Sequence, residues 1–129
     1  MKKKLINNNN SKVNLIELLK NEMNNKGTID INICSSIIIK NIIKSDINKF
    51  EQLDIILELS NKEGISNIEK NLYKSVYYYI TYHLLKEFIN NKLKSSDPFD
   101  ENIKKSSDLL KRVKFYSVNK WNSFTKEFN

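Results

Sequence analysis

The sequence contains two glycines, one proline, one cysteine and one histidine in 129 residues. So little glycine and proline disfavours an all-β architecture, which depends on frequent tight turns, and favours helices. The single Cys34 excludes an intramolecular disulfide, so nothing indicates secretion. Cys34 and His83 alone cannot complete a zinc site, and we predict neither a metal nor another cofactor.

Long apolar runs are also absent. The most apolar stretch, residues 29–43, is interrupted by polar side chains and falls short of the roughly 20 apolar residues that a membrane span needs. The lysine-rich start, Met1–Ile6, is followed by four asparagines where a signal peptide would continue with apolar residues. We therefore expect an intracellular protein without a membrane span, in which residues 1–12 are a disordered, Asn/Lys-rich lead-in.

Features of an enzyme are weak. Two glycines leave no phosphate-cradling loop, and no Ser or Cys partner for His83 is recognisable by spacing. The carboxylates of Asp97, Asp100 and Glu101 lie at a predicted helix start, where interaction with the helix dipole explains them. We therefore predict a non-enzymatic protein without catalytic residues.

Apolar residues recur at helical spacing over residues 13–129, which we interpret as one all-α domain, a compact bundle of about six helices. The stretch Ile29–Ile43 is rich in β-branched residues and could be a strand. No second convincing strand exists to pair with it, so we predict a helix capped by Asp30. The helix before it is expected to have Ser11 as its cap and to end at Gly27.

The most regular element begins at Ser66, after a third helix for which Asp46 is the predicted cap. Ser66 and Glu69 have the spacing of a capping box. Apolar residues then follow in steps of four and predict a long buried helix: Leu72, Val76, Ile80, Leu84 and Phe88. The tyrosines of this segment fit either ring packing around a core or a stacking platform for bases, and they are Tyr73, Tyr77, Tyr78, Tyr79 and Tyr82.

Positive charge is concentrated in the last quarter of the chain. Between Ile103 and Lys126 there are seven basic residues and one acid, Asp108, whereas residues 5–102 contain twelve lysines and thirteen acids. Aromatic residues alternate with these basic residues. The pattern is typical of a helix that binds a polyanion, because phosphates are contacted by Lys and Arg. The alternative is a solvated, lysine-rich face in a sequence with strong Asn, Lys and Ile bias.

Residues 76–129 have the order of elements of a helix-turn-helix unit, which we predict to bind DNA. The long helix is expected to stop at Ser95–Pro98, and a short helix follows over residues 99–106. Asp108 then caps a basic amphipathic helix that runs to the C-terminal end.

This segment resembles homeodomain-like DNA-binding domains over about a third of the chain. The first helix of that family carries a Leu followed four residues later by a Phe, here Leu84 and Phe88. The third helix begins with Val-Lys and carries an Asn a few positions on, here Val113 and Asn119. The spacing from Phe88 to both residues fits the family without a gap.

Over residues 83–128 the resemblance implies a DNA-binding regulator of transcription, with adenine reading by Asn119 and core packing by Tyr116. A departure from the family is Ser117, where an aromatic residue is expected. Small, Asn/Lys-rich mating-type regulators of social amoebae are similar in size and composition, which implies a role in mating-type or developmental control in the nucleus, with duplex DNA as partner. The implied DNA-contacting residues are Lys111, Arg112, Lys114, Val118, Asn119, Lys120 and Asn122.

A non-enzymatic helical interaction protein is the alternative function: a complex subunit, an adaptor or a viral Bcl-2-like bundle whose groove accepts a partner helix. In that case Trp121, Phe124 and Phe128 anchor the core or an interface, and the lysines maintain solubility. A protein partner or a homodimer is compatible with this alternative and with DNA binding.

Overall fold

The computed structural model describes residues 14–44, 46–95 and 100–129. The predicted lead-in, residues 1–12 with Ser11, lies outside the described residues. All regular structure in the described part is helical, which confirms the all-α prediction. It comprises five α-helices and one π-helical turn rather than about six helices: α1 (Leu15–Lys26), α2 (Ile31–Ile38), η1 (Ile39–Ile43), α3 (Lys49–Ser60), α4 (Asn67–Ser95) and α5 (Glu101–Phe128).

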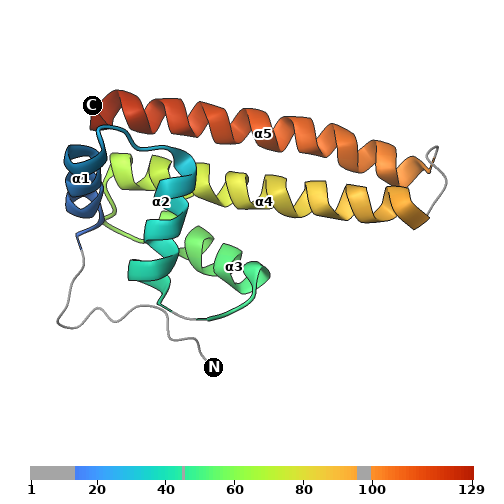
Figure 1. Ribbon diagram of the computed structural model, residues 1–129, viewed down its shortest axis with the longest axis horizontal. Coiled ribbons are helices and arrows are strands. Elements are labelled where there is room, and N and C mark those ends of the chain that lie inside the picture. The colour runs from blue at the N-terminus through green and yellow to red at the C-terminus, as the bar shows by residue number, and fades with distance from the viewer. Residues whose placement is uncertain (1–13, 45, 96–99) are drawn as a thin grey trace.

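The two longest helices, α4 and α5, form an antiparallel hairpin (Figure 1). The three shorter α-helices gather around one half of this hairpin, and the other half projects beyond them. We call the covered half the base (residues 67–83 and 112–128) and the projecting half the tip (residues 84–95 and 101–111).

The hydrophobic core lies in the base. Its largest fully buried side chain is that of Phe124, whose ring centroid is 5.2 Å from that of Trp121 and 5.1 Å from that of Phe128. All five α-helices and η1 contribute to this core, so burial of its apolar surface holds α1, α2 and α3 against the hairpin. The fully buried apolar residues are Leu15, Leu19, Cys34, Ile38, Ile43, Ile56, Leu72, Val76 and Phe124.

Local capping fixes the ends of α1 and the start of α2. The cap of α1 is Asn14 and not the predicted Ser11, because the helix begins at Leu15, and Asn14 Oδ1 accepts the N–H of Glu17 at 3.2 Å. Gly27 adopts a left-handed backbone (φ 79°), and its N–H donates to the Met23 carbonyl at 2.7 Å, as the prediction of a helix end there requires. The Asp30 carboxylate accepts the N–H of Ile33 at 2.8 Å. The predicted helix in Ile29–Ile43 and its cap are thereby confirmed, with the last turn wound as the π-helical η1.

The cap of α3 differs from the prediction. Asn48, not Asp46, precedes the first helical residue, and its Oδ1 accepts the N–H of Glu51 at 2.9 Å. Both side chains are good caps, so the start of the helix decides which one is used. At α4 the Glu69 N–H donates to Ser66 Oγ at 3.3 Å, and the Ser66 hydroxyl donates to the Glu69 carboxylate at 2.8 Å.

The apolar stripe of α4 is buried only along the base. Val76 and Ile80 belong to the core, but Phe88 on the tip is 43% exposed. The prediction that the whole helix is buried is therefore wrong for its second half. The reason is that α1, α2 and α3 do not extend over the tip (Figure 1).

The largest correction concerns α5, which is one unbroken helix. Asp100 caps it and accepts the N–H of Asn102 at 2.7 Å. The predicted cap Asp108 is exposed in the middle of the helix, and the short helix over residues 99–106 does not form a separate element. Apolar residues continue to face α4 on both sides of Asp108, and no Gly or Pro interrupts the helix. The described residues of 76–129 thus form a two-helix hairpin without the predicted helix-turn-helix order, and residues 96–99, which include the first residue of the predicted short helix, lie outside the described part.

Candidate nucleic-acid interface

One side of α5 packs against the rest of the protein. Its buried residues follow one another at intervals of ten, four, seven and four, each close to a whole number of turns, which places them on a single side of a helix with 3.6 residues per turn. We call this side the inner face, and its buried members are Ile103, Val113, Ser117, Phe124 and Phe128. None of them is charged.

The opposite side of α5 is exposed and basic. Phe115 lies at its centre with 63% of its surface exposed, which is unusual for so large an apolar side chain. Helical spacing places eight exposed residues on this side, which we call the basic face: Lys104, Lys105, Lys111, Arg112, Phe115, Asn119, Asn122 and Lys126. Two exposed acids, Glu101 and Asp108, lie on the same side, and no salt bridge within the described part of the chain neutralises the four basic residues between 104 and 112.

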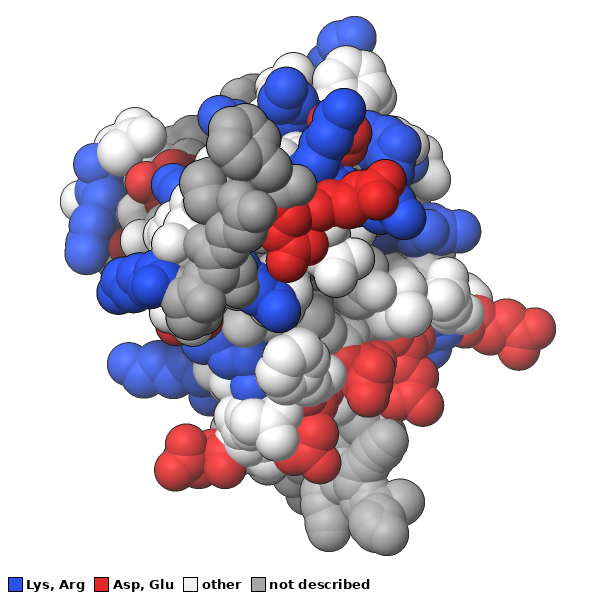
Figure 2. Space-filling model, turned by 90° about the vertical axis from the view of Figure 1, so that its right-hand side faces the viewer, with Lys and Arg blue, Asp and Glu red and all other residues white. Residues whose placement is uncertain are grey.

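Charge differs between the helices of the molecule. The helix α5 contains seven basic and three acidic residues, whereas α3 contains one basic and three acidic residues. Figure 2, which shows the molecule from the tip of the hairpin, has Lys and Arg concentrated in its upper half and Asp and Glu more frequent below. Positive charge is therefore in excess over α5, although acidic side chains also lie in the upper half of this view.

The structure brings together four of the seven predicted DNA-contacting residues. Lys111, Arg112, Asn119 and Asn122 are exposed on the basic face. The other three lie on the edges of the inner face. Lys120 is half-buried on one edge, and Lys114 and Val118 lie on the other edge.

Lys114 and Val118 are exposed, but they lie on the side of α5 that is next to α4. The Lys114 ammonium is 5.8 Å from the centroid of the Tyr82 ring, a cation–π distance. With Tyr82 and Trp121, both residues line a small apolar pocket of about 240 Å³. Phosphate contacts by Lys114 would therefore compete with its contact to the ring.

The predicted set of DNA-contacting residues omitted Lys104, Lys105, Phe115 and Lys126, although all four belong to the basic and aromatic pattern between Ile103 and Lys126. The available signal was the helical period itself, because steps of three, four and seven from Arg112 reach all of them. The incorrect helix break near Asp108 assigned the two lysines before it to another helix.

Tyr116 is not the core residue that the family resemblance implied. Its ring is 44% exposed and lies 5.4 Å from the ring of Tyr78 and 6.1 Å from the ring of Phe115. The inward position belongs to Ser117, whose hydroxyl donates to the Ser75 carbonyl at 3.0 Å. Two small residues thus meet where α4 and α5 pack closely, and the aromatic ring is turned outward.

The tyrosines of α4 are mostly packing residues. Tyr73 is buried in the core, and this burial, together with the charge of Glu69, raises the pKa of its hydroxyl. The other four are half-buried. Aromatic surface beside the basic face therefore comes from Phe115 and Tyr116 of α5.

Cys34 and His83 occupy very different surroundings. Burial, with a contribution from Asp30, raises the pKa of the Cys34 thiol to about 12, so the thiol is neutral and shielded. His83 is exposed, and desolvation, Lys86 and Lys49 lower its pKa.

Among the residues that the structure describes, no three His, Cys, Asp or Glu side chains are grouped to hold a metal ion. No described helix is long and apolar enough to cross a membrane.

Comparisons of the chain with protein-family models, with curated proteins and with solved structures find no match. What bears on function is therefore the geometry and charge of the chain itself.

Proposed function

We propose that the protein binds duplex DNA along the basic face of α5. The observation that carries this proposal is the placement of Lys104, Lys105, Lys111 and Arg112, exposed and without salt bridges to other described residues, on the side of α5 opposite its packed face. Phosphate groups are the ligands that such a row of Lys and Arg recognises, and they provide most of the affinity of non-specific DNA binding.

The shape of the hairpin is compatible with this use. At 28 residues α5 is about 42 Å long, given a rise of about 1.5 Å per residue. It lies at the edge of the molecule, with α4 between most of its length and the short helices (Figure 1). A major groove about 12 Å wide admits one α-helix. In this proposal the continuous α5 enters the groove with α4 behind it.

Sequence reading in this arrangement is assigned to Asn119. Its amide can donate to and accept from an adenine edge, and the residue is exposed on the basic face between Phe115 and Asn122. Lys111 and Arg112 contact the phosphates that flank the groove. The family resemblance of the sequence extends this proposal to a nuclear regulator of transcription in mating-type or developmental control.

The salt dependence of DNA affinity tests the proposal. With about four to six phosphate contacts, the logarithm of the association constant should fall against the logarithm of salt concentration with a slope of about −3.6 to −5.4. The double substitution Lys111→Gln and Arg112→Gln should reduce that slope by about 1.8.

The matched control is Lys40→Gln with Lys62→Gln, two exposed lysines outside α4 and α5. This pair changes the net charge by the same amount and should leave the slope within error. No detectable binding at about 50 mM salt, or an equal loss of slope in both variants, would contradict the proposal.

A helical interaction protein is the second candidate, and exposed apolar residues of the tip favour it. Phe88, Leu93 and Leu109 are each at least two-fifths exposed. A partner protein or a second copy of the chain could cover them. Sedimentation at increasing protein concentration distinguishes a homodimer from a surface for another protein. If the chain forms a homodimer, its sedimentation coefficient should rise with concentration, whereas it should stay constant if the surface binds a different protein.

A further inference from the structure

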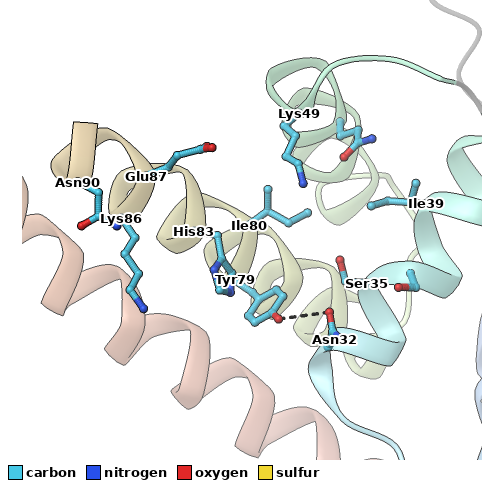
Figure 3. Close-up of a pocket in the computed structure, with 12 residues that line it drawn as sticks. Asn32, Ser35, Ile39, Lys49, Tyr79, Ile80, His83, Lys86, Glu87 and Asn90 are labelled. Carbon is cyan, nitrogen blue, oxygen red and sulfur yellow. Dashed lines mark hydrogen bonds between the residues drawn. The ribbon is translucent and has the colours of Figure 1, made fainter. Parts of the chain in front are cut away.

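A polar cleft with a volume of about 620 Å³ lies between α2, α3 and α4, on a side of α4 that α5 does not cover (Figure 3). This volume lies within the range of small-molecule sites. Polar side chains from all three helices line it, among them Ser35 of α2, Lys49 and Gln52 of α3, and His83 and Lys86 of α4.

The charge of the cleft is predominantly positive. Lys49 is the first residue of α3, and Figure 3 shows its ammonium directed into the space above Ile80. Lys86 belongs to the rim, but its side chain points away from Lys49 toward α5 (Figure 3), and its ammonium is 5.6 Å from the centroid of the Tyr82 ring. Glu87 is the acid among the lining residues. The positive end of the α3 dipole adds to the field, because Lys49 and Gln52 come from its first turns.

Ser35 provides a second, independent indication of a ligand. Its side chain is only 6% exposed, and its hydroxyl has no hydrogen-bond partner among the described residues. The other three buried serines, Ser60, Ser75 and Ser117, each donate to a backbone carbonyl. A buried hydroxyl without a partner is unfavourable, so Ser35 stands out as a donor that is free to bind a group in the cleft.

We propose that this cleft binds a small ligand through a phosphate group, with Lys49 and the Ser35 hydroxyl as its main contacts and Lys86 at the rim. A dianionic, tetrahedral group suits the Lys49 ammonium together with the hydroxyl and amide donors that the three helices bring to the cleft. The site shares no residue with the basic face of α5, so the two proposals can fail independently.

The test is an NMR titration of the 129-residue chain, labelled with ¹⁵N, at constant ionic strength. Inorganic phosphate and adenosine monophosphate are the two probes. Saturable shifts of the amides of Ser35, Ser36 and Gln52 with either probe are expected. Binding of the nucleotide at least about tenfold tighter than phosphate would identify a phosphate ester as the ligand, and equal affinities would identify phosphate itself.

Three variants decide whether the cleft holds the group. Both Lys49→Gln and Ser35→Ala should weaken binding about tenfold, since each removes a hydrogen bond to a charged group. The control Lys62→Gln, an exposed lysine beyond the other end of α3, should leave affinity unchanged. The proposal is overturned if neither probe gives saturable shifts, if the shifts map to the basic face of α5, or if Lys62→Gln and Lys49→Gln weaken binding equally.

Discussion

The inner face and the basic face of α5 belong to the same helix but differ in burial, charge and packing. The inner face buries Phe124 completely and contains no buried charge, whereas the basic face leaves Phe115 mostly exposed among lysines. Packing against α4 and the core already accounts for the inner face. Positive charge gathered on the other side disfavours folding through self-repulsion, so it contributes nothing to stability. The comparison teaches that packing explains the inner face but not the basic face, for which we propose DNA as the ligand.

The largest expected effect on stability comes from replacing one phenylalanine on each face by alanine. Phe124→Ala should lower the free energy of unfolding by about 3 to 5 kcal/mol, because it leaves a cavity in the core. Phe115→Ala should change it by less than about 0.5 kcal/mol. Urea denaturation followed by circular dichroism measures both. A large loss for Phe115→Ala would mean that this ring is covered in solution, and the distinction between the faces would not hold.

The next effect concerns DNA reading. Asn119→Ala should cost about 1 to 3 kcal/mol of binding free energy at a single base position, since a bidentate contact with adenine is lost. The free energy of unfolding should stay the same, because the side chain is exposed. Selection from random duplexes measures the preference. If the variant selects the same sequences as the original protein, Asn119 does not read a base, even where charge alone retains binding.

A smaller effect is expected at the contact between the two long helices. Ser117→Ala removes the hydrogen bond to the Ser75 carbonyl and should lower the free energy of unfolding by about 1 kcal/mol. Ser123→Ala, at an exposed position on the same helix, is the control and should have almost no effect. Equal values for the two variants would show that the inner face tolerates loss of this contact.

The smallest effect is a pH dependence from His83. Its pKa is lowered in the folded protein by desolvation and by the charges of Lys86 and Lys49, so the unfolded chain takes up the proton more readily. The stability of the folded state should therefore decline slightly as pH falls from about 7.5 to 5.5, through the ordinary histidine pKa of about 6.5. Urea denaturation of His83→Asn should show a smaller decline over this range. If the free energy of unfolding of His83→Asn declines as much as that of the original protein, the decline comes from other titratable groups.

Local signals were sufficient to predict much of the fold. The helix end at Gly27, the cap at Asp30 and the pairing of Ser66 with Glu69 depend on residues no more than four positions apart, so the sequence alone contains the interaction. The basic, amphipathic character of the last helix was predictable for the same reason.

Tertiary contacts decided what the sequence could not. The segment Ser106–Asp108 can cap the start of a helix, and it can equally form one turn within a long helix. Packing of α5 on α4 selects the turn within a long helix. The exposure of Phe88 depends on where the short helices end. The polar cleft combines Ser35, Lys49 and Lys86 from three helices, and no spacing along the chain brings them together.

The most direct test of the central claim is a map of the DNA-binding surface by NMR. Amide shifts of the ¹⁵N-labelled chain should be recorded as a short DNA duplex is added at low salt. The account predicts shifts and line broadening concentrated at Lys104, Lys111, Phe115 and Asn119, with α3 unaffected. Shifts concentrated on α1, α2 or α3, with the outer side of α5 unchanged, would contradict the assignment of the basic face as the surface that binds DNA.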